Sequence, residues 1–124
     1  MAGGWDDYYS YSDVVEMINL ETNSSCIVNV KLDQPRWYHT GDGDMVCGGL
    51  DDHYNHYNTL SSCYNIATGT TIQMNNERFS HTSWSRSNGQ EIYLIGGQPS
   101  SNLRTTELIT ENSTQPAFEL FHST

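Results

Sequence analysis

The stretch DDHYNHYN, residues 51 to 58, holds the side chains of this chain best suited to coordination chemistry. Two imidazoles, His53 and His56, follow a pair of carboxylates. Imidazole and carboxylate ligands suit zinc and copper. A metal site needs three or four converging ligands. The stretch 51–58 follows the glycine pair Gly48-Gly49, and the stretch QPSSNL, which follows a second such pair at Gly96-Gly97, contains no metal-ligating side chain of this kind. We therefore interpret residues 51 to 58 as a solvated polar loop and predict no metal or other cofactor.

Composition limits the size of the fold and the class of partner. The 124 residues allow one domain with a modest core. Fifteen acidic residues against five basic ones give a formal net charge of -10, and the basic residues are scattered singly. Because binding to phosphates requires clustered Lys and Arg, the composition argues against nucleic acid as a partner and disfavours anionic membranes, and we expect neither. No apolar window approaches the roughly 20 residues of a membrane span, and the N-terminal residues lack signal-peptide features, so an intracellular location is the default expectation.

The chain is expected to form strands and no long helices. No stretch of a dozen residues keeps an apolar stripe at helical spacing, while Gly, Asn, Ser and Thr interrupt the sequence every few positions. Short apolar segments between these turn formers are typical of strands. We predict strands at 13–20, 25–31, 38–41, 44–48, 60–66, 70–75, 79–84, 91–96, 104–110 and 117–122.

A repeated phrase organises these strands. Glycine doublets recur 45 and then 48 residues apart, a period typical of an array of repeats. The phrases PRWYHTGDGDMVCGG and ERFSHTSWSRSNGQEIYLIGG precede the second and third doublets. In each, Arg is followed by an aromatic residue, His-Thr, a polar turn and an apolar strand that ends in Gly-Gly. The repeat is defined by Gly3, Gly4, Gly48, Gly49, Gly96, Gly97, Arg36, Arg78, His39 and His81.

This unit resembles a divergent kelch repeat, the four-stranded antiparallel blade of a β-propeller, most clearly over residues 35 to 110. The resemblance implies an all-β fold with the last two strands of one blade in 1–34, a blade in 35–76 and another in 77–124. Closed propellers use about four to eight blades, so we expect an open, partial propeller. It would be a fragment of a larger protein, or would close by self-association. The resemblance also implies that Arg36 and Arg78 hold blades together, with His39 and His81 on the same strands.

The resemblance gives the polar stretch a place in the blade. It follows Gly48-Gly49 directly and precedes the predicted strand at 60–66, so it would connect the second and third strands at one rim of the propeller. Such connecting loops often carry ligand contacts. The candidate partner-contact loop comprises Asp51, Asp52, His53, Tyr54, His56 and Tyr57.

The cysteines allow two interpretations. Cys47 ends the predicted second strand and Cys63 lies in the third, so antiparallel pairing would bring them within reach of a disulfide. The alternative is a pair of reduced thiols in the cytosol. A bonded pair would favour an extracellular location, and Cys26 has no evident partner.

We expect a protein-interaction module without enzymatic activity. Its acidic charge favours another protein with a basic surface as the partner. The alternative is an extracellular carbohydrate-active or galactose-oxidase-like copper enzyme, which the family resemblance admits. The oxidase chemistry requires a tyrosine crosslinked to a cysteine, with histidines converging on copper.

Overall fold

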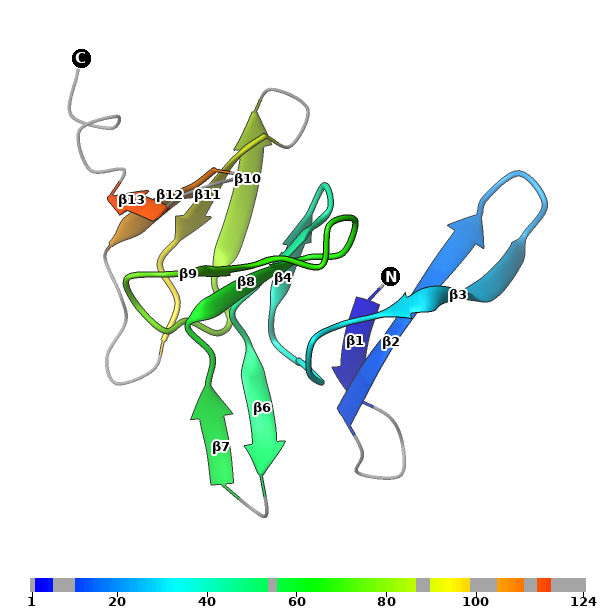
Figure 1. Ribbon diagram of the computed structural model, residues 1–124, viewed down its shortest axis with the longest axis horizontal. Coiled ribbons are helices and arrows are strands. Elements are labelled where there is room, and N and C mark those ends of the chain that lie inside the picture. Colours follow the sequence, from blue (N-terminus) through cyan, green and yellow to red (C-terminus); the bar gives the residue numbers. More distant parts are fainter. Residues whose placement is uncertain are drawn as a thin grey trace.

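The protein consists of antiparallel sheets, as expected from its sequence (Figure 1). The computed structural model describes residues 2–5, 11–53, 56–86, 90–98, 105–110 and 114–116. Over these residues it contains three separate sheets and a two-stranded hairpin, and no helix. The all-β class and the antiparallel pairing are therefore confirmed. None of the sheets closes on itself.

The first sheet has three strands, one more than the two expected in 1–34. Its order is β1 (Ala2–Trp5), β2 (Tyr11–Asn19) and β3 (Ser24–Lys31). The additional strand, β1, contains the first glycine doublet and pairs with β2 in the register Gly4↔Ser12. A four-residue strand with two glycines has no alternating apolar pattern, so the sequence gives little sign of it.

The second sheet forms from β4 (Thr40–Asp42), β5 (Met45–Cys47), β8 (Ser62–Asn65) and β9 (Thr71–Gln73), paired in that order. The polar turn GDGD connects the first two strands, and Gly43 adopts the positive φ of 57° that this tight reversal requires. Between β5 and β8 the chain makes a hairpin of its own, β6 (Leu50–His53) with β7 (His56–Thr59). All four sheet strands fall within the predicted blade 35–76.

The third sheet repeats the same order with β10 (Thr82–Arg86), β11 (Glu91–Ile95), β12 (Thr106–Ile109) and β13 (Thr114–Pro116). These strands fall within the predicted blade 77–124. The last strand had been expected at 117–122, which lies outside the described residues, and β13 precedes that range.

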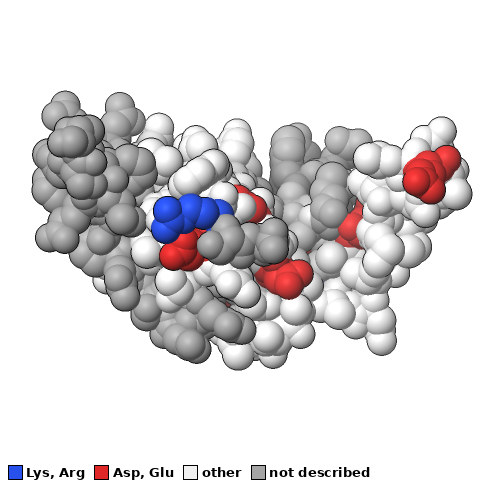
Figure 2. All heavy atoms as spheres, turned by 90° about the horizontal axis from the view of Figure 1, so that it is seen from above, with Lys and Arg blue, Asp and Glu red and all other residues white. Residues whose placement is uncertain are grey.

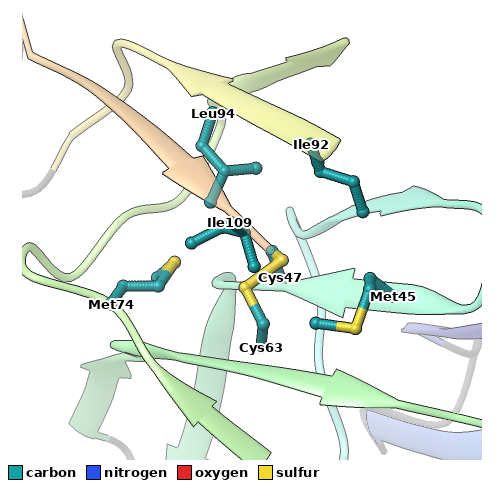
Figure 3. Packing of buried hydrophobic residues seen from close by; sticks show 7 residues of the cluster. All are labelled: Met45, Cys47, Cys63, Met74, Ile92, Leu94 and Ile109. Atoms are coloured by element: carbon teal, nitrogen blue, oxygen red, sulfur yellow. A yellow bond between two sulfur atoms is a disulfide. The ribbon is translucent and has the colours of Figure 1, made fainter. Parts of the chain in front are cut away.

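The apolar core lies between the second and third sheets (Figure 3). Alternate residues of β11, Ile92 and Leu94, lie on one face of the third sheet and pack there with Ile109 of β12. The second sheet contributes Met45, Cys47, Cys63 and Met74. Each of these seven side chains is almost fully buried. The core therefore fixes how these two sheets stack.

The cysteine pairing is settled in favour of the disulfide. Cys47 and Cys63 are register partners on β5 and β8, and a disulfide joins them across the sheet inside the core. Cys26 lies exposed on the first sheet as a free thiol.

The outer sheets leave apolar side chains exposed at positions that are buried elsewhere. Ile18 on β2 and Ile109 on β12 occupy equivalent positions, each two residues after a glutamate. Ile18 is nevertheless 49% exposed, whereas Ile109 is 1% exposed. In the same way Ile95 and Cys47 each precede a glycine doublet, and they are 39% and 1% exposed. The side chain that has a neighbouring sheet is covered, and its counterpart at the end of the row is not. The first sheet, seen apart from the other two in Figure 1, also exposes Met17, Leu20, Ile27 and Val30.

The disulfide provides a first test of the fold. Replacing both Cys47 and Cys63 by alanine should lower the free energy of unfolding by about 3 kcal/mol, because the bond closes a loop of 16 residues in the unfolded chain. Urea denaturation followed by circular dichroism measures the change. Cys26→Ser is the matched control and should leave stability unchanged, since that thiol is exposed and unbonded. Three titratable thiols in the purified, unreduced protein would contradict the pairing.

Candidate functional site

The stretch DDHYNHYN forms a β-hairpin and not the loop expected from its sequence. Strands β6 and β7 pair in the register Leu50↔Thr59, Asp51↔Asn58, Asp52↔Tyr57 and His53↔His56. Tyr54 lies between the two strands, outside the described residues, and the side chains of 52–57 are not described either. The hairpin connects the second and third strands of its sheet, as predicted for the loop, and Figure 1 shows it extending away from the sheets.

The base of the hairpin is held by backbone and apolar contacts. Trp37 and Leu50 exchange two backbone hydrogen bonds, with N···O distances of 3.1 and 2.7 Å. The Leu60 N–H donates to the carbonyl of Gly49 at 2.9 Å. Leu50 and Leu60 are both buried there. These contacts fix where the hairpin leaves the sheet.

A buried arginine links the end of β5 to the start of β8 in the second sheet. Arg36 is fully buried, and its Nη1 donates to the carbonyls of Gly48 and Ser62 at 3.1 and 2.9 Å. Its Nη2 donates to the Ser62 hydroxyl at 2.9 Å. Asp33, three residues earlier, supplies the counter-charge, with Nη2 3.0 Å from Oδ2. One guanidinium thus joins the ends of the second and third strands.

The third sheet repeats this arrangement around Arg78. Its Nη1 donates to the carbonyls of Gly96 and Thr105 at 2.7 and 2.8 Å, and Nη2 donates to the Thr105 hydroxyl at 2.7 Å. Here the counter-charge is Glu107 of β12, whose Oε2 lies 2.8 Å from Nε. Both partners of this ion pair are buried. A buried pair of this kind is stable only when hydrogen bonds satisfy its remaining polar atoms, and they do so here.

The arginine side chains bond chiefly within their own sheet, which corrects part of the expectation that they hold blades together. The contacts between sheets come from other atoms of the repeat. Gly4 N–H donates to the Arg36 carbonyl at 2.8 Å, and Gly49 N–H donates to the Arg78 carbonyl at 2.7 Å. Glu107 adds a link through Oε1, which accepts from Asn75 N–H in the connection between the sheets at 2.5 Å.

The first glycine of each of the first two doublets packs against the following repeat. A Cβ at Gly48 would overlap the Arg78 carbonyl oxygen and the His81 ring, and one at Gly3 would meet the equivalent atoms of Arg36 and His39. Both glycines have positive φ, 64° and 69°. The two junctions between consecutive sheets therefore share one construction, which we call the diglycine junction.

The histidines lie in the diglycine junctions, one residue before β4 and β10 and not on strands shared with the arginines. His81 Nε2 shares a hydrogen bond of 2.7 Å with the Thr40 hydroxyl of the preceding sheet, while Nδ1 is buried without a hydrogen-bond partner. Burial, then the charges of Arg78 and His39, lowers the pKa of His81 to about 4. Burial likewise lowers the pKa of His39. Both imidazoles are therefore neutral at pH 7.

The sequence did not single out several residues of this arrangement. Ser62, Thr105, Asp33 and Thr40 are small polar residues that occur throughout the chain and carry no distinctive pattern. Glu107 had a usable signal, because TTELI at 105–109 aligns with VVEMI at 14–18.

The described contacts bear on the copper-oxidase alternative and on metal binding. Cys47 and Cys63 bond to each other, so neither thiol is free for the tyrosine crosslink of the oxidase alternative. Among the side chains that the structure describes, which exclude those of 52–57, no three His, Cys, Asp or Glu residues are grouped to hold a metal ion.

No family model matches the chain, and no curated protein matches it. The described residues contain no helix long and apolar enough to cross a membrane.

Removing the buried guanidinium should destabilise the protein strongly. Arg78→Met leaves the Glu107 carboxylate buried without its counter-charge, at a cost of about 3–5 kcal/mol in the free energy of unfolding. Arg86→Met is the matched control, because its ion pair with Glu91 is largely exposed and should contribute less than about 1 kcal/mol. Urea denaturation compares the two variants. Equal, small losses would show that the Arg78 cluster does not hold the strand ends.

Acid should weaken the protein through His81. Its pKa is about 4 in the folded state and near 6.5 when unfolded, so the unfolded chain binds the proton first as pH falls. The stability contributed by this residue is complete above pH 6.5 and is lost between about pH 6.5 and 4, amounting to about 3 kcal/mol. The free energy of unfolding of wild type and His81→Gln, measured across this range, isolates the effect because both proteins share every carboxylate. Parallel curves would contradict it.

Proposed function

We propose that this chain is part of a kelch-type β-propeller that acts as a protein-interaction module without catalytic activity. Two four-stranded sheets of the same strand order, preceded by a three-stranded one, support the propeller. So does the repetition of the diglycine junction at both boundaries between sheets. Each blade of a propeller contacts only its neighbours, so such stacking is expected to repeat the same contact geometry at every boundary between blades.

The exposed apolar residues of the end sheets fit this assignment. Ile18 and Ile95 occupy positions that are covered by a neighbouring sheet elsewhere in the row. Further blades, or a second copy of the chain, would cover them. Exposed apolar faces and unpaired strand edges otherwise favour aggregation.

The observation that carries the binding function is the β6–β7 hairpin. It extends from the end of the second sheet at which β5 connects to β8, and its base is fixed by buried contacts. Connections of this kind on a rigid scaffold are common sites of recognition. We assign the partner contact to Asp51, Asp52, His53, Tyr54, His56 and Tyr57.

The surface charge favours a partner with a basic surface. The chain has five basic residues, of which Arg36 and Arg78 are buried, and among the described residues the one buried acid is Glu107, so few basic groups offset the acidic surface. On the face drawn in Figure 2 basic atoms appear at one small place, beside an acidic side chain, whereas acidic side chains occur at several separate places. Complementary charge would speed association and make it sensitive to salt. The disulfide favours an oxidising compartment, consistent with an extracellular location.

Binding by the hairpin predicts a selective loss of partners. Replacing residues 51–58 by a short Gly-Asn-Gly turn should remove specific partners from the set that the chain captures, while the sheets stay folded. Quantitative affinity capture in chelator-containing buffer compares this variant with wild type and with Arg86→Met as a surface control. The lost partners should bind wild type directly, more weakly as salt rises. An identical set of captured proteins from both would refute the assignment of the hairpin as the contact.

A further inference from the structure

The hairpin register brings three residues of metal-ligating types, one aspartate and two histidines, to one face of β6–β7. His53 and His56 are directly opposed, and Asp51 is opposed to Asn58 one pair further from the turn. Because residues alternate between the two faces of a strand, positions 51, 53, 56 and 58 share one face. Asp52 and Tyr57 belong to the other face, with the buried Leu50.

We propose that Asp51, His53 and His56 form a binding site for a divalent transition-metal ion of the zinc–copper class. Directly opposed residues of antiparallel strands have Cβ atoms about 4.5–5.5 Å apart, and diagonal neighbours about 7–8 Å apart. Two imidazoles with metal–nitrogen distances of about 2.0–2.1 Å can meet at one ion from such positions. Imidazole with carboxylate is a ligand set for this class of metal, and three protein ligands leave a fourth position open.

The register also answers the objection raised from sequence. A metal site needs at least three ligands that converge, and a loop would not have brought these residues together in a defined way. In the hairpin three ligands are assigned to one face, on strands whose base is held by the Trp37–Leu50 hydrogen bonds and the buried Leu60. A scaffold ordered before binding reduces the entropy that a metal must overcome to assemble its ligands. The net charge of -10 further favours the approach of a cation.

Zinc binding to the purified chain tests the proposal without any protein partner, so its outcome is independent of the interaction function. Isothermal titration with Zn²⁺ should show one strong site. His53→Asn and His56→Asn should each weaken it by more than about tenfold, since even partners outside the ligand shell commonly matter by that factor. Asp51→Asn should weaken it, whereas the neighbouring Asp52→Asn and, near the end of the sequence, His122→Asn should not. Affinity should fall as pH drops through about 6.5, where free histidine becomes protonated.

A measurement on the wild-type protein avoids any dependence on how the variants fold. Zinc should shift the imidazole ¹⁵N resonances of His53 and His56, while those of His39 and His81, which lie in the diglycine junctions, stay unchanged. No saturable zinc binding, equal losses in Asp51→Asn and Asp52→Asn, or shifts confined to other histidines would overturn the proposal.

Discussion

The structure depends on the need to satisfy one buried guanidinium in the second sheet and another in the third. An arginine removed from water must find a carboxylate and several other oxygens. The carbonyl oxygens come from the ends of the second and third strands, and the carboxylates from Asp33 and Glu107. In meeting that need, Arg36 and Arg78 fix the places where the glycine doublets turn away from β5 and β11. Because the donors form a rigid planar fork, their acceptors can occupy few alternative positions.

The same two arginines take part in the diglycine junctions. While the side chain bonds within its own sheet, the backbone carbonyl of each arginine accepts from the doublet of the preceding sheet. This close backbone approach excludes a side chain at Gly48, and the neutral His81 fills the space beside it. Each arginine thus serves twice, since its side chain satisfies buried polar groups within its own sheet and its backbone carbonyl contacts the preceding sheet.

The sequence was informative wherever a residue type recurred with a fixed role. The doublets, the arginines and the histidines mark equivalent places in the repeat, and the antiparallel strand order brought Cys47 and Cys63 together as expected. Strands built from periodic apolar residues, such as Glu91–Ile95, were located within one or two residues. These features are encoded locally, by side chains with few alternative uses.

Other features depend on partners that the sequence does not identify. The β6–β7 hairpin is almost entirely polar, so no apolar alternation distinguishes it from a loop, and its register comes from backbone pairing. The acid for the arginine comes from Asp33 three residues earlier in one sheet and from Glu107, 29 residues later, in the other. A rule derived from one repeat would therefore have failed in the next.

The uneven covering of the three sheets has a consequence for motion. In a row whose members contact only adjacent members, each sheet opens at a free energy set by the contacts it would lose. The first sheet would give up few apolar contacts, whereas separating the second and third would expose the common core and its crosslink. Backbone amide hydrogens of β2 and β3 should accordingly exchange with solvent through local openings of low free energy. Those of β5 and β11 should exchange only when the sheets separate or the whole protein unfolds. The molecule carries a gradient of rigidity that rises along the chain from its first sheet toward the shared interior.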